Sequence, residues 1–221
     1  MNQIATRPPT ALTAAVQRLA SGAPGARAPG PPRRGPATLV YAAGLLTADR
    51  LASLLKQVPA PLRVAVTSRA CQRLGLHDQV RLRSRVKTVA TPRGHQEERL
   101  LNFVDARRGI TTGVSAADRA LTISLLASPR SSAADLVTPG HMLPVRAEAG
   151  EPTPAGRALA LCEAAHLTAC ALLCPLLDEQ GEPALDAALA SASAALGAER
   201  ILETEVDEAM DAAAAGGYWW S

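Results

Sequence analysis

Apolar and polar residues follow each other along the chain in short segments, and the spacing of the apolar positions changes from helical to extended and back. In TALTAAVQRLAS, Leu12, Val16 and Leu19 recur at helical spacing, and Thr10 stands where a helix cap is favoured. The next stretch, GAPGARAPGPPRRGPA at 22–37, is dense in proline and glycine, which remove ladder donors and favour turns. We therefore predict a short amphipathic helix followed by a loop.

Beyond this loop the pattern alternates between strands and helices. Runs of β-permissive apolar residues predict strands at TLVYAAGLL, LRVAVTS and LLNFVDA, and helical spacing predicts helices at TADRLASLLKQV and SRACQRLGL. The C-terminal third is predicted to continue as helix 155–168, strand 169–177, helix 184–196, strand 199–203 and helix 205–214. This alternation predicts an α/β fold, a mixed α+β sheet with flanking helices in a single domain.

The two ends of the chain differ from this central part. We expect residues 1–9 to be a flexible N-terminus, 10–214 to form the domain and 215–221 to be a flexible tail. The tail carries three aromatic side chains behind a pair of glycines: Tyr218, Trp219 and Trp220. Docking of this tail onto the domain or onto a partner is the alternative to a free end.

Length and composition narrow the class of protein. At 221 residues and 48% hydrophobic composition, the chain can bury one substantial core. No apolar run approaches the roughly 20 residues that span a bilayer, and the N-terminus lacks the features of a signal peptide. We therefore expect a soluble, cytoplasmic protein with no membrane partner. The net charge is only +3 and aromatic residues make up 2%, so nucleic acid is not an expected partner either.

Positive charge is concentrated in one segment, 81–99, which holds six basic residues against two glutamates. A solvated loop explains this composition. A rim that attracts a phosphorylated or carboxylated ligand is the alternative, and binding of a polyanion is a third reading.

The four cysteines form no C-x-x-C pair, and we expect them to be reduced. Cys162 and His166 are four residues apart on a predicted helix. This spacing fits a packed helix face with a capping histidine, and it also occurs among ligands of a soft metal. Because no second pair stands at a fixed spacing, the packed face is the preferred interpretation.

The most polar motif of the predicted domain is ITTGVSAADRALTI, at 110–123. Ser115 and Asp118 are spaced as in a helix-capping box, in which the hydroxyl accepts a first-turn N–H and the carboxylate favours the positive helix end. A helix N-terminus preceded by Thr111, Thr112 and Gly113 could also present free N–H groups and hydroxyls to an anion. Both readings place a helix start immediately after this loop.

Two segments carry a resemblance to a known family. TTGVSAADRALTI and the later TPGHMLPVRAEAG resemble the central signature of the 3,4-dihydroxy-2-butanone 4-phosphate synthases, which convert ribulose 5-phosphate to a four-carbon ketone phosphate and formate. The resemblance implies a single mixed-sheet α/β domain, a homodimer with sites near the subunit interface, and a small anionic or polar ligand. It implies His141 and Asp118 as catalytic residues. The substrate-binding residues that it implies are Arg33, Thr111, Thr112, Ser115 and Arg119.

The chain departs from the family where the family holds its metal. The family's acidic R-E-N-E-G-D loop corresponds to RRGPAT, its G-H-T-E-A to EPTPAGRALAL, and the glutamate of its late strand to proline. Arg34, Pro154 and Pro175 thus stand at or near the places of the family's Glu, His and Glu. Since Mg²⁺ needs anionic oxygen ligands, we expect no metal and no other cofactor. Ordinary synthase activity should fall by on the order of a thousandfold or more.

Three functions follow from this comparison of motifs. The preferred one is a metal-independent enzyme, recruited to another, specialised pathway and acting on a small anionic or polar molecule through His141. The alternative is a non-catalytic descendant that binds a ligand or a partner. An authentic riboflavin-pathway lyase with relocated ligands is third, because a Pro/Gly-rich loop lacks the clustered carboxylates of the family loop.

Overall fold

The computed structural model describes residues 10–28, 37–58, 61–79, 99–177 and 186–214. Within these ranges a central sheet has the strand order β4-β6-β3-β7-β2-β1-β8, and β5 pairs with β6 beside that path. The strands are β1 (Gly25–Ala28), β2 (Thr38–Ala42), β3 (Arg63–Val66), β4 (Arg99–Leu100), β5 (Val104–Ala106), β6 (Leu136–Arg146), β7 (Cys170–Pro175) and β8 (Glu199–Leu202). The α-helices are α1 (Thr10–Ala20), α2 (Ala48–Gln57), α3 (Ser68–Leu74), α4 (Ala116–Ala127), α5 (Pro154–Ala164), α6 (Asp186–Leu196) and α7 (Glu203–Ala214), with short 3₁₀ turns η1 (Ala43–Leu45) and η2 (Ala133–Asp135).

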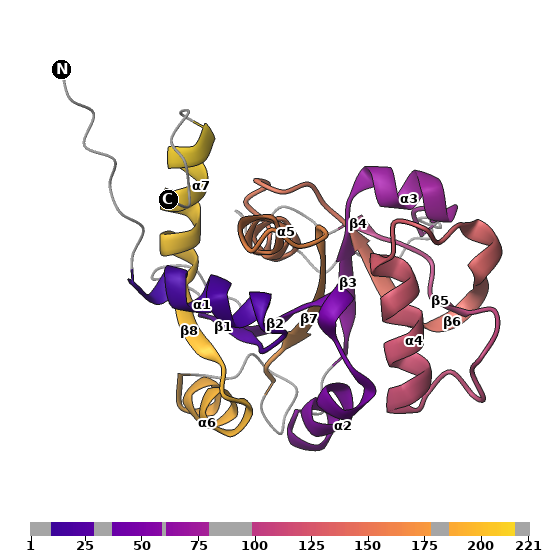
Figure 1. The fold of residues 1–221 in the computed structure, drawn as a ribbon, viewed down its shortest axis with the longest axis horizontal. Coiled ribbons are helices and arrows are strands. Elements are labelled where there is room, and N and C mark those ends of the chain that lie inside the picture. The colour runs from indigo at the N-terminus through magenta and orange to yellow at the C-terminus, as the bar shows by residue number, and fades with distance from the viewer. Residues whose placement is uncertain (1–9, 29–36, 59–60, 80–98, 178–185, 215–221) are drawn as a thin grey trace, which may run out of the picture.

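Helices cover both faces of the sheet, so that the predicted single α/β domain with flanking helices is confirmed (Figure 1). One apolar core lies under α2, α3 and α4 and includes Leu54 and Ile123. A second core lies under α1, α5 and α7 and includes Leu19, Leu159 and Val206. Alternate residues of the central strands supply the two cores, as a sheet buried on both faces requires.

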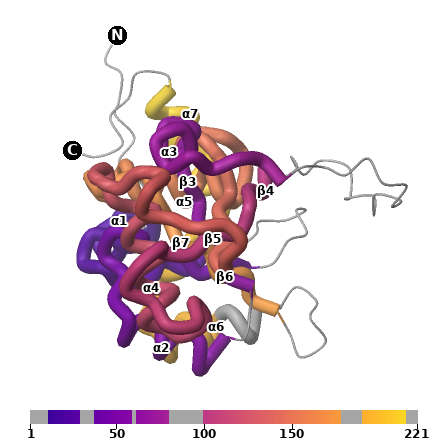
Figure 2. The backbone as a smooth tube through the Cα atoms, turned by 90° about the vertical axis from the view of Figure 1, so that its right-hand side faces the viewer, coloured from indigo at the N-terminus to yellow at the C-terminus, as the bar shows by residue number. Residues whose placement is uncertain are grey.

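Strand β6 links the sheet to the region that carries the motif at 110–123. Its last residues, Leu143–Arg146, run parallel to β3 inside the central sheet, whereas its earlier part pairs with the short β5. Helix α4 packs against both β5 and β6, and these three elements lie together at one end of the molecule (Figure 2). The motif at 110–123 is therefore held between a helix and a strand pair.

Two of the helices begin directly after a capping threonine. Helix α2 begins after Thr47, whose hydroxyl accepts the N–H of Arg50, and α3 begins after Thr67, whose hydroxyl accepts the N–H of Ala70. Side-chain oxygens at such positions satisfy backbone donors that the helix leaves unpaired.

The predicted loop at 22–37 is wrong for Gly25–Ala28, which form the buried strand β1. No proline falls within these four residues, and β1 lies between β2 and β8, the two strands with which it pairs. The one long side chain, Arg27, is buried with its charge paired to Glu203 and a hydrogen bond donated to Thr38. Proline flanking therefore marked the ends of a strand that we read as a loop.

Strand β6 was not predicted, and the predicted strand LLNFVDA is divided between β4 and β5. The prolines and glycine of TPGHMLPVR are unusual within a strand, but the segment lies in an 11-residue strand. Its pairing with β5 shifts register: Val104 lies opposite Met142, whereas the next residue, Asp105, lies opposite Val137. The intervening residues of β6 bulge outward, and such bulges re-aim side chains.

The predicted helix at 155–168 ends earlier, and its Cys162 and His166 do not share a face. Helix α5 stops at Ala164, and His166 adopts a left-handed backbone with φ of 55°. The N–H groups of His166 and Leu167 then donate to the carbonyls of Glu163 and Cys162, which closes the helix end. Cys162 is buried and His166 is exposed, so the pair is no metal site, and His166 is a capping residue.

Several expectations fall on residues outside the described ranges: the N-terminus 1–9, Arg33 and Arg34, most of the basic segment 81–99, and the tail 215–221. Among the helices that are described, none has the length and apolar character needed to cross a membrane.

Candidate functional site

The start of helix α4 is capped as predicted. The hydroxyl of Ser115 accepts a hydrogen bond from the backbone N–H of Asp118 at 3.1 Å. Ser115 has extended backbone angles, and the helix begins at the next residue. This half of the capping box is confirmed and gives Ser115 a structural role.

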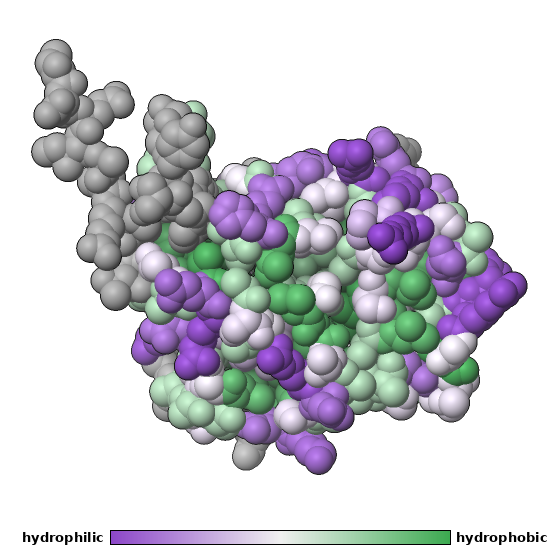
Figure 3. Space-filling view, viewed as in Figure 1, coloured by the Kyte–Doolittle hydropathy of each residue, from purple (hydrophilic) through white to green (hydrophobic). Residues whose placement is uncertain are grey.

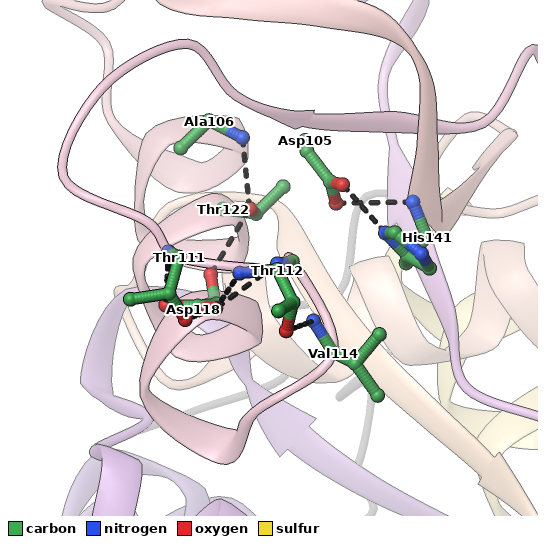
Figure 4. Close-up of polar contacts among 9 residues, drawn as sticks. Asp105, Ala106, Thr111, Thr112, Val114, Asp118, Thr122 and His141 are labelled. Atoms are coloured by element: carbon green, nitrogen blue, oxygen red, sulfur yellow. Dashed lines mark hydrogen bonds and ion pairs between the residues drawn. The ribbon is translucent and has the colours of Figure 1, made fainter.

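The carboxylate of Asp118 does something the capping box does not predict. It accepts hydrogen bonds from the backbone N–H groups of Thr111, Thr112 and Gly113 at 3.0–3.2 Å, and one from the Thr111 hydroxyl at 2.9 Å (Figure 4). The N–H groups of the loop are therefore taken up by the chain's own carboxylate and are not free for an anion. An anion site at the first-turn N–H groups of α4 stays a prediction.

These contacts also set the ionisation of Asp118. Burial of the carboxyl raises its pKa, but the hydrogen bonds from Thr111, Gly113 and Ser115 outweigh burial and hold the pKa below its ordinary value of 3.8. A carboxylate with a lowered pKa and this many donors is a poor proton acceptor. Asp118 thus shapes the loop, and the catalytic role that the resemblance implies for it stays a prediction.

His141 lies on the outward bulge of β6 and is held by Asp105 of β5. One oxygen of the Asp105 carboxylate accepts the backbone N–H of His141 at 3.0 Å, and the other lies 2.7 Å from the ring nitrogen Nδ1 (Figure 4). The Asp105 side chain is 7% exposed, whereas that of His141 is 45% exposed. Since an ionised carboxylate only accepts, this contact places a proton on Nδ1, and in the neutral imidazole the second ring nitrogen, Nε2, then has a lone pair.

Two glycines make room for this pair. A Cβ atom at Gly113 would lie 2.3 Å from Asp105 Oδ2 and 2.6 Å from His141 Nδ1, and Gly113 has a φ of +79°. A Cβ atom at Gly140 would lie 2.1 Å from the backbone carbon of Val104. Both positions therefore require glycine, and Gly113 places the loop held by Asp118 directly against the Asp105–His141 pair.

The remaining predicted site residues are Thr112, Arg119 and Arg33. Thr112 is exposed, and its hydroxyl accepts the N–H of Val114 within the same loop. Arg119 lies in the first turn of α4, and its buried Nε atom has no hydrogen-bond partner among the described residues. Arg33 lies outside the described ranges. The structure thus brings together Thr111, Thr112, Ser115, Asp118 and His141.

Asp105 is the candidate site residue that the sequence reasoning missed. It is a charged residue in the middle of an apolar stretch, NFVDA, and it is buried. A buried carboxylate needs partners, so an acidic residue in a predicted strand interior was the available signal.

The described residues do not fit a magnesium site. No group of three His, Cys, Asp or Glu side chains in the described ranges could hold a metal ion. The two carboxylates nearest the quoted motif, Asp105 and Asp118, are taken up by hydrogen bonds from His141 and from the loop 111–113. The chemistry available here is that of an exposed imidazole oriented by a carboxylate.

A separate group of buried charges lies on the other face of the sheet. Glu203 of α7 pairs with Arg27 of β1 and with Arg157 of α5, and Arg157 also donates two hydrogen bonds to Asp207 at 2.6 and 2.9 Å. Two positive and two negative charges are thereby balanced away from water. This group fixes α7 to the domain and takes no part in the site around His141.

Similarity to one family of known proteins extends over most of the chain. A family model described as 3,4-dihydroxy-2-butanone 4-phosphate synthase matches residues 14–205. The riboflavin biosynthesis protein RibBA of Salinispora arenicola is 36% identical over 151 residues, which make up 65% of this chain and 33% of that protein. RibBA of Nocardia farcinica is 34% identical over 148 residues, 65% of this chain and 34% of that protein. The chain therefore spans about a third of the length of these curated relatives.

Solved structures share the fold. The 3,4-dihydroxy-2-butanone 4-phosphate synthase of Candida albicans superposes with a TM-score of 0.75 at 25% identity, over 89% of this chain and 95% of that one. A synthase of the same name, solved in complex with two magnesium ions, gives a TM-score of 0.77 at 23% identity, over 94% of this chain and 99% of that one.

Proposed function

Since the chain belongs to the 3,4-dihydroxy-2-butanone 4-phosphate synthase family, we propose that it is a lyase- or isomerase-type enzyme in which His141 moves a proton on a small polar molecule. The observation that carries this proposal is the Asp105–His141 pair, with Nδ1 of the imidazole 2.7 Å from a buried carboxylate. An imidazole held in this way is suited to general acid–base catalysis.

The proposed step follows from the contacts of the pair. Asp105 binds both the backbone N–H and the ring of His141, so the ring is fixed in one orientation with Nε2 as its available base. A carbon-bound proton next to a carbonyl group could pass to Nε2, and Asp105 would stabilise the imidazolium that forms. The relatives' names point to a hydroxyketone or its phosphate as the substrate class.

We propose further that this step needs no divalent metal. Arg34, Pro154 and Pro175 stand at or near the places of the family's metal-binding and acidic residues, and the described side chains offer no alternative group. Such an enzyme would serve a pathway other than riboflavin synthesis. The authentic synthase is the second candidate, and the 36% identity to a riboflavin biosynthesis protein favours it.

The test is solvent deuterium exchange. The protein is incubated in D₂O with ribulose 5-phosphate, dihydroxyacetone phosphate or dihydroxyacetone, in EDTA and separately in Mg²⁺, and loss of the carbon-bound proton is followed by NMR. We expect exchange in EDTA that falls by about 10²-fold or more in His141→Ala. His77→Ala, which removes another exposed histidine, is the matched control.

Each other result points to a different function. Formate release from ribulose 5-phosphate that requires Mg²⁺ would identify an authentic synthase and overturn metal independence. Saturable binding without exchange for any of the three compounds would favour a ligand-binding descendant. Exchange that is unchanged in His141→Ala would refute the role of His141.

We also propose that the protein is a homodimer with a small-molecule ligand. Support comes from the family resemblance and from large apolar side chains that are exposed near the site, Phe103 at 42% and Val114 at 48%. Light scattering should give the mass of two chains at micromolar concentration, and the mass of one chain would contradict the proposal.

A further inference from the structure

Thr122 of helix α4 lies between the two parts of the site. It is fully buried, and its hydroxyl oxygen accepts the backbone N–H of Ala106 at 2.9 Å. The same hydroxyl donates to the backbone carbonyl of Asp118 at 3.1 Å (Figure 4). One hydroxyl therefore joins the helix that carries Asp118 to the strand that carries Asp105.

The bond from Thr122 to the carbonyl of Asp118 stays within the helix, whereas the bond from the N–H of Ala106 joins the helix to another element. A threonine inside a helix often returns its hydroxyl proton to the carbonyl four residues earlier, as Thr122 does to Asp118. Here the oxygen also receives the N–H of a strand residue, Ala106, which directly follows Asp105. The backbone on the C-terminal side of Asp105 is thereby attached to α4.

The contacts close a ring around the carboxylate of Asp105. From Asp118 the connection runs through Thr122 to Ala106 and so to Asp105. On the other side it runs from the Asp118 carboxylate to the N–H of Gly113, whose α-carbon packs against Asp105 and the His141 ring. These links hold the Asp105 backbone and close one side of its carboxylate, so that its two hydrogen bonds with His141 form from a fixed position.

We propose that Thr122 is a positioning residue for the Asp105–His141 pair, acting through the N–H of Ala106. Its hydroxyl holds the β5 backbone in the position from which the Asp105 carboxylate accepts the Nδ1 proton of His141. It thereby keeps the proton on Nδ1 and the lone pair on Nε2. This inference rests on the proposed function for its catalytic meaning, but the position of the ring proton can be measured whether or not the protein turns over a substrate.

The test compares variants of Thr122 that differ in the hydroxyl. Thr122→Val keeps the shape and removes the hydroxyl, and Thr122→Ser keeps the hydroxyl. Thr67→Val is the matched control, because Thr67 also accepts one backbone N–H, that of Ala70, at the start of α3. The readout is the ¹⁵N NMR spectrum of His141 in uniformly labelled protein at alkaline pH, where the shifts of the two ring nitrogens report the share of each tautomer.

We expect the parent, Thr122→Ser and Thr67→Val to hold mainly the Nδ1–H tautomer, and Thr122→Val to shift toward an even mixture. The exchange rate in D₂O should fall in Thr122→Val by up to about 10²-fold in kcat with little change in KM, as expected for a misplaced base. If Thr122→Val does not fold, Thr122→Cys, which keeps a buried side chain with weak hydrogen-bonding capacity, should show the same shift.

A folded Thr122→Val or Thr122→Cys protein with the parent's tautomer share would overturn the inference. An equal shift in Thr67→Val would also overturn it, because the effect would then follow from general loosening. If the tautomer shifts as expected and no variant exchanges deuterium, including the parent, the positioning role stands and the proposed function fails.

Discussion

Replacement of Gly113 by alanine tests the packing of the site most directly. The new Cβ would lie 2.3 Å from Asp105 Oδ2 and 2.6 Å from His141 Nδ1, well inside contact distance. Relief requires the Asp105–His141 pair to separate or the loop to leave the Asp118 carboxylate. Overpacking of this kind costs about 1–3 kcal/mol, and the left-handed backbone at a φ of +79° adds about 1 kcal/mol for a residue with a side chain. The expected loss of stability is therefore about 2–4 kcal/mol.

Gly150 offers the matched control for this prediction. It also has a positive φ, +95°, but a Cβ atom there would meet no atom within 4 Å. Gly150→Ala should therefore show only the backbone cost of about 1 kcal/mol. Urea denaturation followed by circular dichroism measures the free energy of unfolding of both variants. In thermal denaturation, the Tm of Gly113→Ala should lie about 4–16 °C below that of the parent. Equal destabilisation of the two variants would refute the close contact between Gly113 and the pair.

Three further predictions concern the rest of the described structure. Glu203→Ala should destabilise the protein by about 3–5 kcal/mol in urea denaturation, because it leaves the buried Arg27 and Arg157 without their shared carboxylate; a loss below 1 kcal/mol would contradict this. The lowered pKa of Asp118 contributes stability above about pH 4 that is lost as the pH falls through the folded-state pKa, so Asp118→Asn should lose less stability than the parent between pH 7 and pH 3; equal losses would contradict this. Burial raises the pKa of every cysteine, to about 11 or 12 or beyond, so Ellman's reagent at pH 8 should label none in the folded protein within minutes and all four in urea: Cys71, Cys162, Cys170 and Cys174.

The sequence was sufficient for the elements whose signals are local. Helices α2 and α4 follow Thr47 and Ser115, where a side-chain oxygen caps the first turn. Strands β3 and β7 are continuous apolar runs, as expected of strands covered on both faces. In each of these cases the residues that decide the structure lie within a few positions of it.

Strands β1 and β6 could not be predicted because tertiary contacts decide them. Gly25–Ala28 have weak strand propensity, and they are strand because β2 and β8 pair on either side. In β6 the prolines interrupt the pattern, but the strand lies between β3 and β4 in its second half and beside β5 in its first. Propensity is a weak guide wherever neighbours distant in sequence supply the hydrogen bonds.

The candidate site was predicted in its composition but not in its connections. The motif supplied Thr111, Thr112, Ser115 and Asp118, and the resemblance supplied His141. What the sequence did not contain was the distance between residues 105 and 141, which are 36 positions apart and meet because β5 pairs with β6. The partner of the histidine therefore became visible only with the sheet.

The occupation of the loop by Asp118 changes where a ligand can bind. Three consecutive N–H groups and one hydroxyl of the loop already donate to the carboxylate of Asp118, which is tethered in the first turn of the helix that follows. An external anion would have to displace this carboxylate, and a tethered group competes at a high effective concentration. An anionic group of the substrate is therefore better held by residues outside this loop, which leaves the exposed imidazole of His141 as the group that we propose meets the substrate here.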